Sequence, residues 1–139
     1  MATFVISSVA HPDSCLDVQG GVCHNGIKVA SWGRHGGPNQ SWILESAPAG
    51  GFYLRSFANP AFVLDLSSGA SKPSNGQVVH VWGFHGFPNQ RWLIEPSGTG
   101  SVVIKSAHSP EYVLDLDGGH AADGTRIFAW SRHNHPNQR

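Results

Sequence analysis

Three side chains that together suit a polar, ring-shaped ligand recur along the chain. Each copy has an aspartate in a Leu-Asp-Val or Leu-Asp-Leu motif, then a tryptophan, then an asparagine seven residues after the tryptophan. The asparagine always belongs to a Pro-Asn-Gln motif. The recurring residues are Asp17, Trp32 and Asn39, then Asp65, Trp82 and Asn89, then Asp115, Trp130 and Asn137.

An aromatic face, a carboxylate and a carboxamide match the surface of a pyranose sugar. The C–H patch on one side of galactose can lie flat on an indole ring, whose face carries partial negative charge. A carboxylate accepts hydrogen bonds from two neighbouring hydroxyls, and an amide both donates and accepts. One such site is shallow and binds weakly. Three sites on one rigid body can together bind a clustered glycan ~10²-fold or more tightly than one site does.

A purely structural role is the alternative for these residues. Aspartates beside turns often accept hydrogen bonds from the backbone, and an outward tryptophan can cover the end of a barrel. Symmetry of the fold requires only the core residues to repeat, so the recurrence of all three residue types favours ligand binding.

The rest of the chain repeats in the same register. The Leu-Asp motifs at 16–18, 64–66 and 114–116 are 48 and 50 residues apart, and a proline and a serine precede each motif at fixed distances. This spacing predicts a tandem repeat of about 47 to 50 residues. We expect one domain, 1–139, with repeats at about 1–48, 49–98 and 99–139.

Each repeat has the pattern of four short strands, and those of the second copy are expected at 52–57, 62–67, 77–82 and 91–96. Three such units can bury a shared core by closing around a pseudo-threefold axis, which predicts an all-β fold. Tight hairpin turns, with both turn residues at positive φ, are predicted at Asn25-Gly26, Asn75-Gly76 and Asp123-Gly124.

Alternation along the strands assigns the two faces of each repeat. The position three residues before each site tryptophan is always apolar (Val29, Val79 and Ile127), so it faces the core and the tryptophan faces outward. In the Leu-Asp motifs the flanking aliphatic residues face inward and the aspartate faces outward. Trp42 and Trp92 are expected in the core because they open apolar strands.

Bulk composition excludes several classes of function. Nine lysines and arginines balance nine aspartates and glutamates, so the formal charge is zero and nucleic acid is not an expected partner. Only 13% of residues are charged, while 17 glycines and 9 prolines favour short strands and turns. No apolar run is long enough to span a membrane, so membrane insertion is not expected.

A few further sequence features predict where the protein is located, whether it needs a cofactor and whether it is an enzyme. The N-terminal segment lacks the pattern of a signal peptide, which predicts a cytoplasmic protein with two free thiols, Cys15 and Cys23. The nine histidines have no recognised metal-ligand spacing, so neither a metal nor another cofactor is expected. A glycosidase needs two carboxyl groups within ~5 to 10 Å, whereas the recurring aspartates belong to different repeats, so the protein is not expected to be an enzyme.

The segment CLDVQGGVCHNGIKVASWGRHGGPNQSW (15–42) resembles the ricin-type lectin repeat, with its Leu-Asp-Val, hairpin glycine, site tryptophan and Gln-x-Trp ending. The resemblance covers nearly the whole chain. It implies a β-trefoil of three four-stranded repeats and, as partners, glycans and glycoproteins that carry galactose or N-acetylgalactosamine. Cytoplasmic mushroom lectins of this family also lack a leader peptide. A defensive role and a homodimer are compatible with the resemblance.

The resemblance also assigns roles within each site. The asparagine is expected to meet a sugar hydroxyl, and the glutamine after it supports the aspartate. Apart from the resemblance, the position of a histidine in the loop beside each site predicts contact with sugar, with loop packing as the alternative. The three expected sites are Asp17, Trp32, His35, Asn39 and Gln40; Asp65, Trp82, His85, Asn89 and Gln90; and Asp115, Trp130, His133, Asn137 and Gln138.

Departures from the family pattern make the three sites unequal. Plant members often have a cysteine two residues after the site tryptophan, where this chain has arginine or phenylalanine, so the family's disulfide to Cys15 is not expected. A glutamine that often contacts sugar is replaced by Ala30, His80 or Phe128. Two extra residues near Lys72-Pro73 lengthen the second repeat. The first site is therefore expected to be the most competent.

The third copy stops at Gln138-Arg139, where the earlier copies continue with a core tryptophan and a fourth strand. We therefore expect the last strand of the trefoil to be missing from this sequence and the natural protein to continue with tryptophan. Two other functions stay open, a β-trefoil interaction protein such as a protease inhibitor, and a carbohydrate-binding module detached from a glycoside hydrolase.

Overall fold

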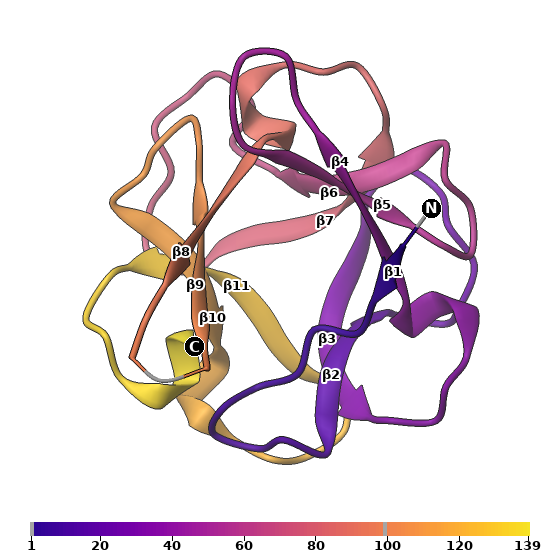
Figure 1. Ribbon diagram of the computed structural model, residues 1–139, viewed down its shortest axis with the longest axis vertical. Coiled ribbons are helices and arrows are strands. Elements are labelled where there is room, and N and C mark those ends of the chain that lie inside the picture. The colour runs from indigo at the N-terminus through magenta and orange to yellow at the C-terminus, as the bar shows by residue number, and fades with distance from the viewer. Residues whose placement is uncertain (1, 99) are drawn as a thin grey trace.

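The computed structural model describes residues 2–98 and 100–139, which form one network of eleven β-strands in three lobes (Figure 1). Lobe 1 holds β1 (Thr3–Phe4), β2 (Ser14–Val18), β3 (Ile27–Gly33) and β4 (Trp42–Ser46). Lobe 2 holds β5 (Phe52–Ser56), β6 (Phe62–Leu66), β7 (Gln77–Gly83) and β8 (Trp92–Pro96). Lobe 3 holds β9 (Val102–Ser106), β10 (Tyr112–Leu116) and β11 (Thr125–Ser131). Short 3₁₀ turns are η1 (Pro38–Gln40), η2 (Pro88–Gln90), η3 (Asp117–Gly119) and η4 (Pro136–Gln138).

The strand pairing explains the three-lobed shape. Within each lobe, the strand with the aspartate pairs with the strand that carries the site tryptophan, as β2–β3, β6–β7 and β10–β11. The strands β3, β7 and β11 also pair with one another in a closed triangle, which arranges the three hairpins around one axis. The pairs β4–β5 and β8–β9 join consecutive lobes. In the described ranges, no helix has the length and apolar character needed to cross a membrane.

A single apolar core lies where the inner faces of the lobes meet. Trp42 and Trp92 are fully buried, and their indole N–H groups donate hydrogen bonds to the carbonyls of Leu16 (3.1 Å) and Leu64 (3.0 Å). The prediction that these two tryptophans are core residues is therefore confirmed. The other predicted core positions belong to this cluster or pack against it, namely Val29, Val79 and Ile127.

The Asn-Gly and Asp-Gly pairs do not form the tight hairpins that the sequence predicts. In lobe 1, β2 ends at Val18 and β3 begins only at Ile27, and of the pair Asn25-Gly26 only the glycine has positive φ (89°). The Asn25 side-chain oxygen instead accepts a hydrogen bond from the amide N–H of Gly83 in lobe 2, over 2.8 Å. The pair does form a local turn, closed by the Ile27 amide, which donates to the His24 carbonyl over 3.2 Å. The prediction was wrong because it took this turn as the whole connection between the two strands and missed the contact with the neighbouring lobe.

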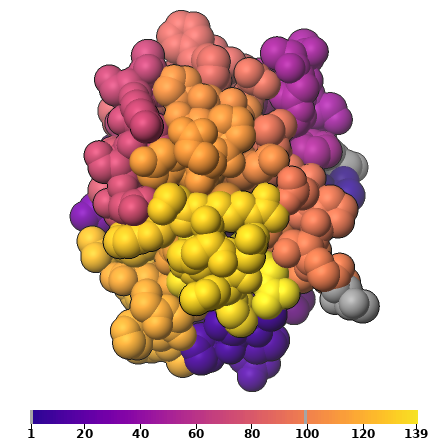
Figure 2. Space-filling model, turned by 90° about the vertical axis from the view of Figure 1, so that its left-hand side faces the viewer, coloured from indigo at the N-terminus to yellow at the C-terminus, as the bar shows by residue number. Residues whose placement is uncertain are grey.

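Lobe 3 has three described strands where the other lobes have four each. Strand β9 pairs with β8 and β10, and β1 pairs with β4, but in the described part of the chain no ladder joins β1 to β9. Figure 2 shows the C-terminal residues (yellow) against the N-terminal segment (indigo), where the Val9 amide donates to the Arg139 carbonyl over 2.9 Å. The two ends of the chain therefore meet through backbone outside the strands.

The opposite environments of the core and site tryptophans can be tested by truncation. Trp92→Ala should lower the free energy of unfolding by about 3 to 5 kcal/mol, because it leaves a cavity in the core. Trp82→Ala, at an exposed position of the same lobe, should change it by less than about 1 kcal/mol. Urea unfolding followed by circular dichroism measures both values. Equal losses for the two variants would contradict the assignment of faces.

Candidate functional site

A buried carboxylate lies at the same place in each of the three hairpins. Asp17, Asp65 and Asp115 stand one residue before the ends of β2, β6 and β10, and each side chain is buried. They face away from the core leucines, as predicted, but lie beneath the surface. Because an unpaired buried charge is costly, such a carboxylate needs hydrogen-bond donors close by.

The glutamine of each Pro-Asn-Gln turn supplies the main donor. Gln40 is fully buried, and its Nε2 donates to the Asp17 carboxylate (2.9 Å) and to the Gly33 carbonyl (3.0 Å). Its Oε1 accepts from the amide N–H of His35 (2.9 Å). Gln90 and Gln138 make the same three contacts in their lobes. The role that the family resemblance implies for the glutamine, support of the aspartate, is confirmed.

Each asparagine is held beside the end of the aspartate strand. The Nδ2 groups of Asn39, Asn89 and Asn137 donate to the last carbonyl of β2, β6 and β10, over 3.2 Å in every lobe. The proline at the start of each 3₁₀ turn fixes the local φ and so helps to direct the asparagine there. The prediction that this turn brings the asparagine to the site is therefore consistent with the structure.

The loop histidines face the carboxylates. In each lobe the histidine Nδ1 accepts a backbone N–H two residues further on, over 2.9 to 3.1 Å, which leaves the ring proton on Nε2. Nε2 lies 3.8, 3.7 and 3.5 Å from a carboxylate oxygen in lobes 1, 2 and 3. These histidines, His35, His85 and His133, therefore close the loop and also present a donor beside the aspartate.

The site tryptophans lie on the outer face and remain accessible, with 41% of Trp32, 39% of Trp82 and 36% of Trp130 exposed. Their place follows from strand register. Ala30 is the cross-strand partner of Asp17, and Trp32 stands two residues further along the same strand, so the indole and the carboxylate share one face. The sequence prediction of outward tryptophans is confirmed.

Each site also contains residues from a neighbouring lobe, which the sequence analysis did not assign to it. Gly124 of lobe 3 lies so close to Trp32 that a Cβ added there would be 3.8 Å from the indole. Beside it, the Asp123 carboxylate accepts the amide N–H of Gly33 over 2.7 Å. The equivalent pair Asn25-Gly26 lies beside Trp82, and the pair Asn75-Gly76 lies beside Trp130. In both pairs the asparagine oxygen accepts the backbone N–H that follows the tryptophan. The recurrence of Asn or Asp before this glycine in every repeat was the sequence feature that could have predicted these contacts.

The three sites differ at the position opposite the aspartate. In site 2, His80 pairs with Asp65 across the hairpin, and its Nε2 lies 2.8 Å from Oδ1 of Asp65. The side-chain amides of Gln90 and Asn89 donate hydrogen bonds to Oδ2 of Asp65. In site 3, Asn137 contacts one oxygen of Asp115 and Gln138 the other.

Site 1 has no polar side chain opposite its carboxylate. Ala30, the residue opposite Asp17, has no polar side chain, and Gln40 and His35 both approach Oδ2 of Asp17. Asn39 also stands close enough to the Asp17 carboxylate to lower its pKa through a side-chain hydrogen bond. The protein donors that contact Oδ1 of Asp65 and Asp115, namely His80 and Asn137, therefore have no polar counterpart at Ala30 in site 1.

Burial raises the pKa of the aspartate in two of the three sites. Burial raises the pKa of Asp17 above its ordinary value, and the hydrogen bond from Gln40 only partly offsets this. The pKa of Asp115 is raised for the same reason, with Gln138 as the partial offset. Both carboxyl groups therefore take up a proton at a higher pH than an exposed aspartate does.

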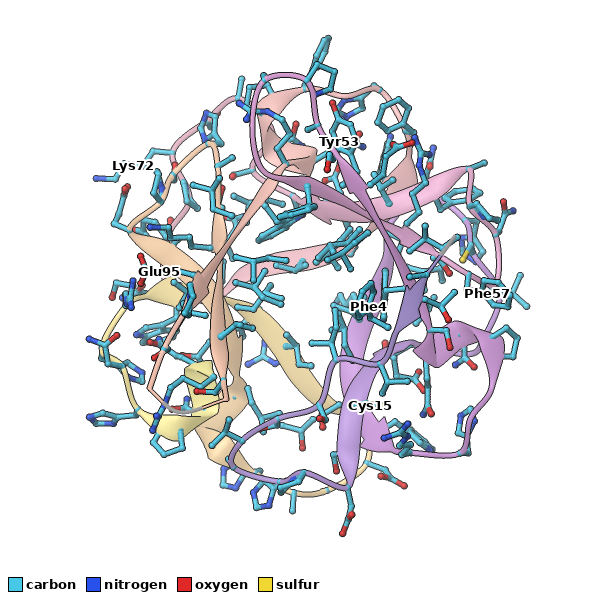
Figure 3. All side chains as sticks on the ribbon, viewed as in Figure 1. Phe4, Cys15, Tyr53, Phe57, Lys72 and Glu95 are labelled. Carbon is cyan, nitrogen blue, oxygen red and sulfur yellow. The ribbon has the colours of Figure 1, made fainter. Side chains whose placement is uncertain are left out.

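The remaining candidate groups lie outside these clusters. Both cysteines, Cys15 and Cys23, are free thiols. The extra residues of lobe 2 lie between β6 and β7, where Lys72 points away from the body of the molecule (Figure 3) and the Ala70 carbonyl contacts His108. In the described ranges, no group of three or more histidine, cysteine or acidic residues is placed to hold a metal ion.

Three hairpin lobes around one axis, each with an exposed indole beside a buried carboxylate and two amides, define a β-trefoil with one candidate ligand site per lobe. The family model for the ricin-type beta-trefoil lectin domain-like family matches residues 2–82 and 68–130. The chain belongs to this family.

Solved structures agree with this assignment of fold. The designed three-fold symmetric protein ThreeFoil is 26% identical, with a TM-score of 0.90 over 98% of this chain and 94% of that one. The Rhizoctonia solani agglutinin shares the fold at 24% identity, with a TM-score of 0.83 over 99% and 91% of the two chains. The C-terminal half of an earthworm R-type lectin, solved in complex with GalNAc, is 27% identical, with a TM-score of 0.73 over 100% and 95%.

A similar fold also occurs inside a longer enzyme. An exo-β-1,3-galactanase from Clostridium thermocellum is 26% identical, with a TM-score of 0.84 over 96% of this chain but only 28% of that one. No curated protein matches the chain by sequence.

The buried glutamine under each site makes hydrogen bonds whose contribution to stability can be measured by substitution. Gln40→Met keeps a similar volume but removes the donor to Asp17, so the free energy of unfolding should fall by about 3 kcal/mol. Gln19→Met, at an exposed position in the same lobe, should change it by less than about 0.5 kcal/mol. Denaturant unfolding of both variants is the measurement, and an unchanged Gln40→Met would show that the bond adds nothing to stability.

Proposed function

We propose that this protein is a lectin without catalytic activity that binds terminal β-galactose or N-acetylgalactosamine on glycans and glycoproteins. The observation that carries the proposal is site 1, where the exposed Trp32 stands on the same face as Asp17 and Asn39. Membership of the ricin-type lectin-like family supports sugar binding. The earthworm lectin in complex with GalNAc supports this class of sugar.

The geometry suggests how one sugar ring would sit in site 1. Its C–H face would lie on the Trp32 indole, and Oδ1 of Asp17 would accept hydrogen bonds from two adjacent hydroxyls. The Asn39 carboxamide and the Nε2 group of His35 lie beside the same carboxylate. Hydrogen bonds to a carboxylate are charge-assisted, so the aspartate would supply most of the orientation and the indole most of the buried area.

The three sites are expected to differ in strength. All three carboxylates accept a hydrogen bond from a glutamine, but Oδ1 of Asp65 also contacts His80 and Oδ1 of Asp115 accepts a hydrogen bond from Asn137. Phe128 also stacks on Trp130, with ring centroids 5.6 Å apart, so one indole face of site 3 is partly covered. A ligand would have to displace these contacts in lobes 2 and 3, which makes site 1 the strongest.

The same geometry supports a binding role over catalysis. The three repeated carboxylates belong to three different lobes, and a glycosidase needs two carboxyl groups at one bond. The glutamine under each aspartate also holds the carboxylate in its acceptor role. Two free thiols fit a reducing compartment, and we extend the proposal to a cytoplasmic location.

Site-resolved binding tests this function. Trp32→Ala should weaken galactose binding at site 1 about tenfold or more, because stacking area is lost without disturbing the buried network. Trp130→Ala is the matched variant in lobe 3 and should leave site 1 unchanged. Titration of the ¹⁵N-labelled proteins with galactose and GalNAc, followed by amide shifts, reports each lobe separately. Wild-type affinity in every variant would exclude these tryptophans from sugar binding.

Acidification should weaken sugar binding while the protein is still folded. Only the ionised Asp17 accepts two hydroxyls, and its raised pKa moves protonation above the ordinary aspartate range. A raised native pKa also means that this group adds stability as the pH falls, so it does not itself unfold the protein. Galactose affinity and circular dichroism should be measured from pH 7 downward. His35→Gln is the control, and a pH dependence abolished by this change would assign the effect to the histidine instead.

A further inference from the structure

Lobe 2 carries an exposed phenylalanine at the margin of its candidate site. Phe87 stands in the loop before the Pro-Asn-Gln turn, and 67% of it is exposed. Its ring lies against that of His85, with the ring centroids 4.8 Å apart and the planes 47° apart. The Nε2 group of His85 lies 3.7 Å from Oδ2 of Asp65. The phenylalanine is therefore one aromatic ring away from the carboxylate of site 2.

The fold does not require an aromatic side chain at the position of Phe87. The equivalent residues are Gly37 in lobe 1 and His135 in lobe 3, and both loops keep the same bond from the histidine amide to the buried glutamine. A Cβ at Gly37 would lie 2.5 Å from Cε1 of His35, so a side chain there would need the histidine ring to move. His135 does lie against His133, with centroids 4.5 Å apart, but its ring is polar. Of the three loops, the one in lobe 2 therefore presents the apolar ring.

The backbone holds this phenylalanine in a fixed place. The Phe87 amide N–H donates to Nδ1 of His85 over 3.1 Å, and its carbonyl accepts the amide N–H of Gln90 over 2.9 Å. Within the same loop, Phe84 packs edge-on against the buried Tyr53, with ring centroids 4.8 Å apart. Because the loop is already ordered, a ligand that packs on the exposed ring loses little affinity to ordering of the backbone.

Site 2 has aromatic rings on both sides of its carboxylate. His80 meets Oδ1 of Asp65 over 2.8 Å and lies beside Trp82, with ring centroids 5.4 Å apart. His85 and Phe87 lie on the side of Oδ2. One sugar ring on the indole leaves the phenylalanine uncovered. The C–H face of a pyranose packs well on an aromatic ring, so Phe87 offers a surface for a second ring.

We propose that Phe87 and His85 form a subsite for the second sugar ring of a glycan whose terminal galactose-type ring lies on Trp82. This inference rests on the function proposed above and extends it to the size of ligand that site 2 recognises. The terminal ring must lie within hydrogen-bond reach of Asp65, and the Phe87 ring stands beyond the histidine that faces this carboxylate. That separation suits the next pyranose of the glycan better than a substituent on the terminal ring. Site 1, with Gly37, binds one ring, whereas site 2 recognises at least two.

Titration of the ¹⁵N-labelled protein with galactose and with lactose tests the subsite. The amide shifts of Gly83 and Gly33, the residues after Trp82 and Trp32, report sites 2 and 1 separately. Lactose should bind site 2 about fivefold more tightly than galactose, while site 1 should discriminate by less than about twofold. Phe87→Ala should remove most of this preference at site 2, because the second ring loses its packing surface. Phe87→Trp should retain it.

Phe57→Ala is the matched control for loss of an exposed phenylalanine. Phe57 is 50% exposed, and its amide bonds to the Ser41 carbonyl of lobe 1 and not to the loop of site 2. This variant should keep the ratio of lactose to galactose affinity at site 2. Equal affinities of the two sugars at site 2 of the wild type, or a ratio unchanged by Phe87→Ala, would overturn the subsite.

Two further outcomes separate this inference from the proposed function. If Phe87→Ala weakens N-acetylgalactosamine binding at site 2 but keeps the preference for lactose, the phenylalanine contacts a substituent of the terminal ring, and the subsite is wrong. If both sugars shift Gly33 but neither shifts Gly83, the subsite is overturned while the lectin function stands. Absence of a shift at either glycine would overturn both.

Discussion

The structure depends on a hydrogen bond between a buried amide and a buried carboxylate, repeated three times. A carboxylate placed under the surface is costly unless donors surround it, and one glutamine per lobe provides them. The same glutamine holds the loop before the 3₁₀ turn to the end of the tryptophan strand, as Gln40 does between His35 and Gly33. One side chain thus fixes the loop, the carboxylate and the strand end that carries the indole, so the candidate site is formed before a ligand arrives.

The sites are products of the closed trefoil and not of single repeats. Each indole packs against a glycine of the neighbouring lobe, and an Asx side chain of that lobe accepts the backbone N–H that follows the indole. The order is cyclic, from lobe 1 to lobe 2, from lobe 2 to lobe 3 and from lobe 3 back to lobe 1. A lone repeat would therefore lack one wall of its own site, which explains why the Asn-Gly and Asp-Gly pairs recur as faithfully as the aspartates.

Periodicity and spacing were enough to predict the repeats, the strands of lobe 2, the buried Trp42 and Trp92 and the outward Trp32, because these depend on alternation within one strand. The contact between His80 and Asp65 depends on cross-strand register, and the role of Asn25 depends on packing between lobes. Neither can be read from a single repeat. The family resemblance anticipated the bond between Gln40 and Asp17, which residue patterns alone did not.

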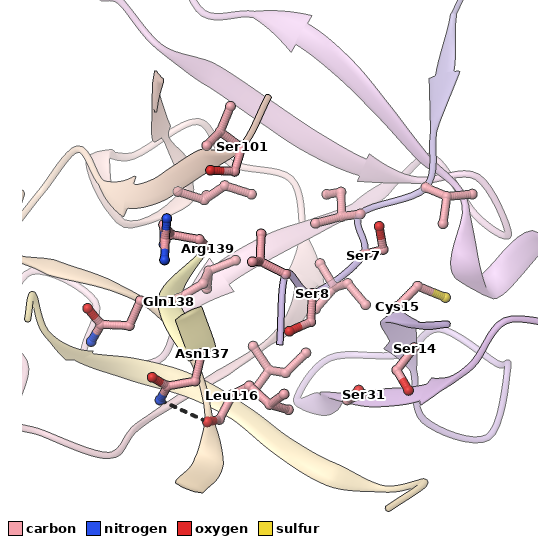
Figure 4. A pocket seen from close by; sticks show the side chains of 18 of the residues that line it. Ser7, Ser8, Ser14, Cys15, Ser31, Ser101, Leu116, Asn137, Gln138 and Arg139 are labelled. Atoms are coloured by element: carbon pink, nitrogen blue, oxygen red, sulfur yellow. Dashed lines mark hydrogen bonds between the residues drawn. The ribbon is translucent and has the colours of Figure 1, made fainter. Parts of the chain in front are cut away.

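Lobe 3 shows how the outer sites and the core are linked. Strand β10 carries Asp115 on its site face, while its neighbours Leu114 and Leu116 line an apolar cavity between the N-terminal segment and lobe 3 on the other (Figure 4). In lobes 1 and 2 the equivalent strand is backed by a fully buried indole. Packed interiors hold the strands above them in place, so Trp42 and Trp92 support the strands that carry Asp17 and Asp65. The two faces of each hairpin are thus tied to different tasks, and the differences between the three sites arise from the residue opposite the aspartate, which is Ala30, His80 or Phe128.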